Sequence, residues 1–156
     1  MNERTAGYCE LPVSVEDDQR ALFDRIADEY QAHYGDRQSL DYRHRFINRH
    51  LFAGIPLAGK KVLDAACGSG ETTAFLAASG AQITGLDISP RMVMSFRQKF
   101  PHAVGVCGSI YETGFDDASF DCVSIVGGLH HFHPQVERAI DEVPRILKPG
   151  GHFVFC

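Results

Sequence analysis

Two aspartates and a glycine-rich segment have the types and spacing that suit the binding of a nucleoside. Asp64 ends a short apolar run in "VLDAACGSGETT" (62–73), and Gly68 and Gly70 follow it. Asp87 ends a second apolar run in "GLDIS", 17 residues after Gly70. Glycines let a backbone approach a ligand closely, and an acid at the end of a second strand can accept both hydroxyls of a ribose. The pattern predicts a loop that wraps a nucleotide-type ligand.

The residues around the loop distinguish between such ligands. No lysine follows the glycines, as a P-loop requires, and Thr73 stands where the dinucleotide fingerprint has its third glycine. Asp64 would repel a pyrophosphate, whereas it would form a charge-assisted hydrogen bond with an ammonium group. One acid for an amine and a second, Asp87, for a ribose fit S-adenosylmethionine better than NAD. The incomplete fingerprint makes an NAD site the weaker of the two predictions, and it stays an alternative.

Alternating strands and helices are expected to position these residues. Apolar runs predict strands at 61–66, 81–87, 102–107, 120–128 and 152–156. Helices are expected at 70–79, from Ser89-Pro90 to residue 100, and at 133–147, where Pro144 should kink or shorten the helix. A turn is expected at "KPGG" (148–151). This alternation predicts an α/β fold, a Rossmann-like parallel sheet flanked by helices.

A helical segment precedes the alternating part of the chain. Residues 14–34 have helical periodicity with Ser14 as the cap, and a second helix is expected from about Leu40 to Phe52. We divide the chain into an N-terminal helical lid or substrate segment (1–56) and a Rossmann-like core (57–156). The basic stretch "RHRFINRH" (43–50) is expected to be a solvated helix face, and an acidic or phosphorylated substrate is the weaker alternative.

Composition limits the classes of function. The chain has 156 residues, enough for one domain, and a formal net charge of −5, so no nucleic-acid partner is expected. No apolar run approaches the roughly 20 residues of a membrane span, and the first residues lack the apolar core of a signal peptide, so we expect a cytoplasmic protein. The five scattered cysteines are expected to be reduced thiols. No metal site is expected, although "HHFH" (130–133) invites that hypothesis.

Four motifs resemble those of class I S-adenosylmethionine-dependent methyltransferases, close to the UbiE-like small-molecule branch. They are "VLDAACGSG", "GLDIS", "FDCVSIVGGLHHF" and "ILKPGGHFVF", in the family's order and spacing, and the resemblance covers residues 61–156. It implies S-adenosylmethionine as cofactor, S-adenosylhomocysteine as product, and methyl transfer to a small-molecule, lipid or sugar-like acceptor.

The resemblance also implies roles for individual residues of the cofactor site. Asp64 and the backbone of Ala66, Gly68 and Gly70 would hold the methionine part. The remaining implied cofactor contacts are Asp87 for the ribose, Ile88, Ser109 and Ile110 for the adenine, and Gly127 near the sulfonium.

Aromatic residues and histidines outside these motifs carry open alternatives. Tyr30 and Tyr34 either contact the cofactor carboxylate or the substrate from the lid, or belong to a core. His130 or His131 either acts as a general base in the loop after the fourth strand, or is a packed histidine.

The sequence departs from the family pattern at three places. Ala66 replaces the first glycine, and Ser109 stands where many members have an acid. The chain stops at Cys156, so the family's sixth and seventh strands are absent. We expect an N-terminal fragment; the alternative is that another chain covers the fifth-strand edge, as in a dimer.

Two other functions stay open on the sequence. One is an NAD-type oxidoreductase domain, and the other is a non-catalytic module that binds a cofactor or a partner.

Overall fold

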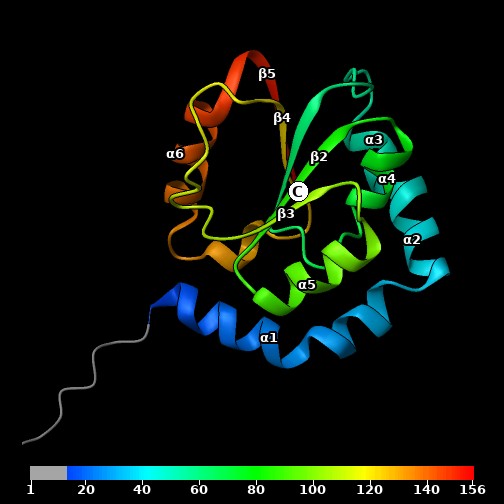
Figure 1. The fold of residues 1–156 in the computed structure, drawn as a ribbon, viewed down its shortest axis with the longest axis vertical. Coiled ribbons are helices and arrows are strands. Elements are labelled where there is room, and N and C mark those ends of the chain that lie inside the picture. The colour runs from blue at the N-terminus through cyan, green and yellow to red at the C-terminus, as the bar shows by residue number, and fades with distance from the viewer. Residues whose placement is uncertain (1–13) are drawn as a thin grey trace, which may run out of the picture.

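Five apolar segments pair into one parallel sheet in the computed structural model of the protein, which describes residues 14–156 (Figure 1). The strand order is β3-β2-β1-β4-β5, and every neighbouring pair is parallel. The order reverses between β1 and β4, which is where open α/β sheets bind ligands. The strands are β1 (Lys61–Ala65), β2 (Gln82–Asp87), β3 (Val104–Cys107), β4 (Phe120–Ile125) and β5 (Leu147–Phe155).

Helices cover both faces of the sheet. Val62 belongs to a core that contains Leu76 of α4 (Thr73–Ala78) and Phe96 of α5 (Pro90–Lys99). Leu63, the next residue in β1, belongs to a second core with Val143 of α6 (Val136–Ile146). Because successive side chains of a strand point to opposite faces, a continuous apolar run fills both cores. This arrangement confirms the predicted Rossmann-like fold.

The helices differ from the predicted ones at their ends. The Asp36 carboxylate accepts hydrogen bonds from the amides of Gln38 and Ser39, so α2 (Arg37–Arg43) begins three residues before Leu40. A π-helical turn (His44–Asn48) and α3 (Arg49–Leu51) follow it. A short 3-10 helix (Leu129–Phe132) follows β4. Helix α6 ends two residues after Pro144, as the missing proline amide leads one to expect.

The turn expected at residues 148–151 lies inside β5. Phe120 pairs with Leu147, and Cys122 pairs with His152. Two steps along β4 therefore correspond to five steps along β5, so β5 contains an irregularity at this point. Gly150 has a φ of +77°, a backbone conformation that glycine adopts without steric cost. The strand is therefore longer than predicted but contains the expected irregularity.

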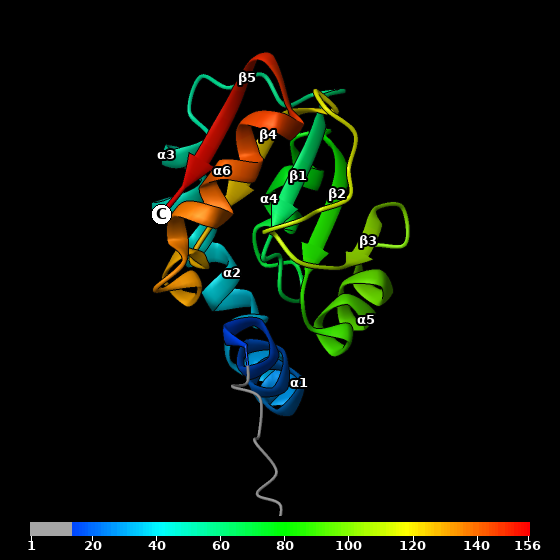
Figure 2. The ribbon, with the colours of Figure 1, turned by 90° about the vertical axis from the view of Figure 1, so that its left-hand side faces the viewer.

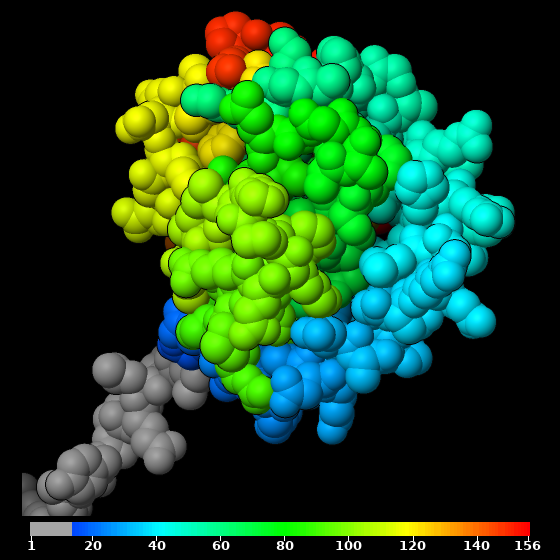
Figure 3. Space-filling view, turned by 45° about the vertical axis from the view of Figure 1, so that its right-hand side comes forward, coloured from blue at the N-terminus to red at the C-terminus, as the bar shows by residue number. Residues whose placement is uncertain are grey.

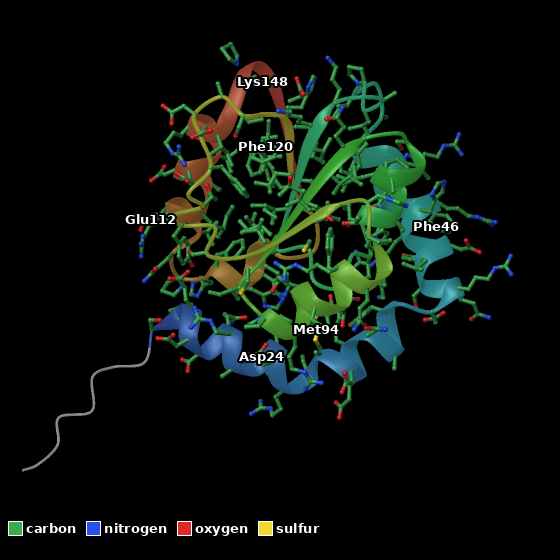
Figure 4. All side chains as sticks on the ribbon, viewed as in Figure 1. Asp24, Phe46, Met94, Glu112, Phe120 and Lys148 are labelled. Carbon is green, nitrogen blue, oxygen red and sulfur yellow. The ribbon has the colours of Figure 1, made fainter. Side chains whose placement is uncertain are left out.

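Helix α1 (Val15–Tyr34) lies across the carboxyl ends of the strands, toward which the arrows of β1 and β2 point in Figure 2. The Asp24 carboxylate accepts a hydrogen bond of 2.5 Å from the Ser89 hydroxyl, and the Arg91 guanidinium donates to Asp28 at 2.8 Å. Ser89 caps α5 and Arg91 lies in its first turn, and a helix N-terminus favours negative charge. Figure 3 shows α1 (blue) against α5 (green), and Figure 4 shows Asp24 between them. These contacts anchor α1 on the core.

The outer edge of β5 has no neighbouring strand among residues 14–156. The Phe153 and Phe155 rings contact each other there, with centroids 4.9 Å apart, and Phe155 is half exposed. The dimer through this edge and the division at residues 56 and 57 stay predictions.

Two further features concern the described part of the chain. None of its helices combines the length and the apolar character that crossing a membrane requires. Cys67 and Cys122 are buried and Cys107 and Cys156 exposed, all as free thiols, while Cys9 lies outside the described residues.

Replacing Leu63 by alanine tests the two-sided core. Leu63 is fully buried in the central strand, so we expect Leu63→Ala to lower the free energy of unfolding by about 2–5 kcal/mol in urea denaturation. Val104→Ala is the control on exposed β3, with 59% of Val104 exposed, and is expected to cost less than about 0.5 kcal/mol. Equal effects of the two substitutions would contradict this core.

Candidate functional site

A cavity lies at the carboxyl ends of β1, β2 and β4, beneath α1. It contains about 910 Å³ of empty space, part of it open to solvent. Of the thirteen residues predicted for the site, nine line this cavity, namely Tyr30, Asp64, Ala66, Gly68, Asp87, Ile88, Ile110, Gly127 and His131. The structure thus brings together residues from α1, two strand ends and the loops after β2, β3 and β4.

Asp64 is buried at the end of β1 and is held by two hydroxyl groups. Thr73 donates to it at 2.6 Å and Ser124 at 3.2 Å. Burial raises the pKa of the Asp64 carboxyl to about 6, against the lowering effect of these hydrogen bonds. Thr73 stands at the third-glycine position of the dinucleotide pattern, and its hydroxyl explains why a side chain is useful there.

Asp87 ends β2 and holds the loop from the other side. Its carboxylate accepts hydrogen bonds from the amide of Gly68 at 2.8 Å and from that of Ser89 at 2.9 Å. Burial raises its pKa, and the same amides oppose the rise. Each carboxylate oxygen has a second lone pair, so Asp87 can still accept the two hydroxyls of a ribose.

Gly70 does not line the cavity. It has a φ of +101°, and a Cβ at this position would lie 2.2 Å from the Phe100 ring. The glycine therefore makes room for an aromatic side chain at the end of α5. Gly68 differs, because the position of its Cβ faces the carboxylate of Glu71 and the ring of Tyr30, both of which line the cavity.

Three other predicted residues also lie outside the lining. The Ser109 hydroxyl accepts a hydrogen bond from the amide of Tyr111 at 2.9 Å. Tyr34 and His130 stand behind residues that do line the cavity, with ring centroids 4.6 Å from Tyr30 and 3.9 Å from His131. Their roles as ligand contacts stay predictions.

His131 lines the cavity beside α1. Its ring meets the Phe23 ring edge-on, with centroids 4.9 Å apart. Burial lowers the pKa of His131, and neighbouring His130 lowers it further. A neutral imidazole can accept a proton, so the position suits a base. Among residues 14–156, no group of three or more histidine, cysteine, aspartate or glutamate side chains could hold a metal ion.

Several residues that line the cavity are not among those predicted from the sequence. Arg43 was expected on a solvated face, but its guanidinium lies near Gly127, with Nη2 3.5 Å from the position of a Cβ there. The α1 periodicity could have indicated Gln19 and Phe23, which lie one helical turn apart on the face toward the cavity. Glu71 follows Gly70 directly, and none of the sequence motifs indicates a role for its side chain.

The fold is an α/β domain whose cavity contains buried carboxylates at the strand ends. Residues 63–155 match the family described as "Methyltransferase domain". The chain belongs to this family, and its fold and motifs are those of the class I S-adenosylmethionine-dependent methyltransferases.

Two curated relatives and one solved structure illustrate the similarity. An uncharacterized methyltransferase, sll0829 of Synechocystis sp., is 42% identical over 96 residues, which are 61% of this chain and 45% of the relative. The demethylmenaquinone methyltransferase of Clavibacter sepedonicus is 38% identical over 112 residues, 67% of this chain and 43% of the relative. The crystal structure of the PH0226 protein from Pyrococcus horikoshii OT3 is 28% identical with a TM-score of 0.73, covering 82% of this chain and 64% of that one. The chain therefore spans less than half the length of these curated relatives.

The contact between Gly70 and Phe100 can be tested by adding one methyl group. We expect Gly70→Ala to lower the free energy of unfolding by about 1–3 kcal/mol because the Cβ overlaps the ring. Gly54→Ala is the matched control, since Gly54 also has a positive φ but nothing within 4 Å of its Cβ position. Phe100→Ala should reduce the cost of Gly70→Ala to that of Gly54→Ala. An unchanged cost in the Phe100→Ala background would disprove the contact.

The buried Asp64 gives unfolding a specific pH dependence. Its pKa is about 6 in the folded chain against 3.8 ordinarily, so the folded state holds the proton more tightly and loses stability as pH rises from about 4 to 6. The loss is at most about 3 kcal/mol for a rise of this size. We expect the free energy of unfolding of Asp64→Asn, measured by urea denaturation between pH 4 and 7, to lack this part of its decrease with pH. Parallel curves for the two proteins would refute it.

Proposed function

We propose that this domain catalyses the transfer of a methyl group from S-adenosylmethionine to a small-molecule acceptor. The observation that supports it most is the charge at the loop. Asp64 and Glu71 are buried next to the loop between β1 and α4, the loop at which a dinucleotide fold binds its pyrophosphate. Such a site repels phosphate but suits a ligand with a ribose and positive charges. Membership of the methyltransferase domain family supports the same conclusion.

The residues of the cavity fit the parts of this cofactor. In our proposal, Asp87 accepts the ribose hydroxyls, Ile88 and Ile110 contact the adenine, and the backbone at Ala66 and Gly68 follows the methionine chain. Arg43 provides a positive charge for the methionine carboxylate. Its guanidinium lies at the wall of the cavity, with Nη2 3.5 Å from the position of a Cβ on Gly127.

For this reaction, the protein mainly has to position the acceptor next to the methyl group. The bound cofactor supplies an activated methyl group on a sulfonium, which an acceptor oxygen, nitrogen or carbon can attack in line. The lid residue Phe23 and the loop residue His131 enclose the cavity on the side of α1, where they would orient the acceptor and exclude water. His131 would accept a proton at a ring nitrogen if the acceptor must lose one.

The acceptor in this proposal is a largely apolar small molecule. The name of the Clavibacter relative indicates a demethylmenaquinone as its substrate, which supports a small-molecule acceptor here. Apolar and aromatic residues at the α1 side of the cavity, such as Phe23, Tyr111 and Phe132, agree with an acceptor that is itself largely apolar. A cytoplasmic location, expected from the sequence, belongs to the same proposal.

Calorimetric titration with S-adenosylmethionine and with NADH tests the proposal. We expect micromolar binding of S-adenosylmethionine, and a loss of at least about tenfold in Asp87→Ala because two hydrogen bonds to a charged acceptor disappear. Asp116→Ala is the control, an exposed acid outside the cavity that should leave the affinity unchanged. Tight binding of NADH without a response to S-adenosylmethionine would favour the oxidoreductase alternative and contradict the proposal.

A further inference from the structure

Glu71 is a buried carboxylate with one oxygen bound and the other facing the cavity. The residue is 7% exposed and lines the cavity. Its Oε1 accepts a hydrogen bond of 2.5 Å from the Ser69 hydroxyl. No hydrogen bond from residues 14–156 reaches Oε2, which lies 3.3 Å from the position of a Cβ on Gly68. Glycine at 68 therefore leaves a path from this oxygen to a ligand.

The other two carboxylates at the loop are bonded on both oxygens. Asp64 accepts Thr73 on one oxygen and Ser124 on the other. Asp87 accepts the amides of Gly68 and Ser89, again one on each oxygen. Glu71 differs from both, since half of its carboxylate has no donor among the described residues. A buried charge is costly unless it is paired, so this oxygen is suited to a positively charged ligand group.

A lysine behind the loop fixes the orientation of Glu71. Lys99 Nζ donates to the Ser69 hydroxyl at 2.7 Å, and that hydroxyl donates to Glu71. Lys99 lies outside the cavity lining, so its charge lies behind Ser69. The chain of hydrogen bonds turns Oε1 toward Ser69 and leaves Oε2 toward the cavity.

We propose that Glu71 recognises a positive charge on the bound ligand, with Ser69 as its positioning residue. The inference rests on the proposed function, because S-adenosylmethionine carries two such charges, an ammonium and a sulfonium. The product keeps the ammonium and has a neutral thioether in place of the sulfonium. A carboxylate beside the sulfonium would distinguish cofactor from product, whereas one beside the ammonium would hold both equally.

Three ligands separate these two sources of charge in titrations of the full chain. S-adenosylmethionine carries both charges, S-adenosylhomocysteine carries the ammonium alone, and 5′-methylthioadenosine carries neither. We expect Glu71→Gln to lower the affinity for S-adenosylmethionine by about 10- to 100-fold and the affinity for 5′-methylthioadenosine by less than about twofold. An equal loss for S-adenosylhomocysteine assigns Glu71 to the ammonium, and an unchanged affinity for it assigns Glu71 to the sulfonium.

Two variants control for net charge and for folding. Glu112→Gln removes the same charge from an exposed glutamate outside the cavity, at the periphery in Figure 4, and should change no affinity. Ser69→Ala keeps the charge of Glu71 but removes the hydrogen bond that orients its carboxylate. It should lower the affinity for S-adenosylmethionine about 3- to 10-fold and leave the affinity for 5′-methylthioadenosine unchanged. This second variant also keeps the test open if Glu71→Gln does not fold.

The outcomes distinguish this inference from the proposed function. If Glu71→Gln weakens all three ligands alike, or none of them, the role in charge recognition is overturned while cofactor binding stands. If the unaltered chain binds none of the three, the proposed function itself fails.

Discussion

Carboxylates buried at the ends of parallel strands are the constraint on which the site depends. Asp64 and Asp87 end β1 and β2, where both side chains are nearly inaccessible to water. Each must therefore find donors within the protein. Thr73 at the start of α4 supplies one for Asp64, and the amides of Gly68 and Ser89 supply two for Asp87. The same hydrogen bonds that satisfy the acids fix the loop between β1 and α4.

The constraint extends from the loop to helix α1. Ser89 donates its amide to Asp87 and its hydroxyl to Asp24 of α1, so one residue connects the strand end with the helix above it. Helix α1 above the cavity is therefore connected through Ser89 to Asp87, the group expected to hold the ribose. At the centre of the sheet, the chain leaves β1 toward one edge and β4 toward the other. The two connections therefore leave room for a ligand beneath α1.

Sequence patterns predicted the elements and strand ends better than the lining of the cavity. Apolar runs determine which segments are buried on both faces, and Asp64 and Asp87 follow such runs directly, so their location was predictable. The motif predicts a role for the Gly70 backbone at the ligand, but it does not indicate that Gly70 also packs against Phe100, thirty residues away in the chain. Arg43 was placed on a solvated face because helical periodicity does not show that α2 passes beside Gly127. Such contacts depend on tertiary packing, which local spacing does not encode.

A crystal structure of the chain with S-adenosylhomocysteine would test the central claim most directly. The account predicts that both ribose hydroxyls lie within hydrogen-bond distance of the Asp87 carboxylate, with the amino-acid chain over Ala66 and Gly68 beneath α1. A ligand seated outside this cavity, or with its ribose away from Asp87, would contradict the assignment of the site.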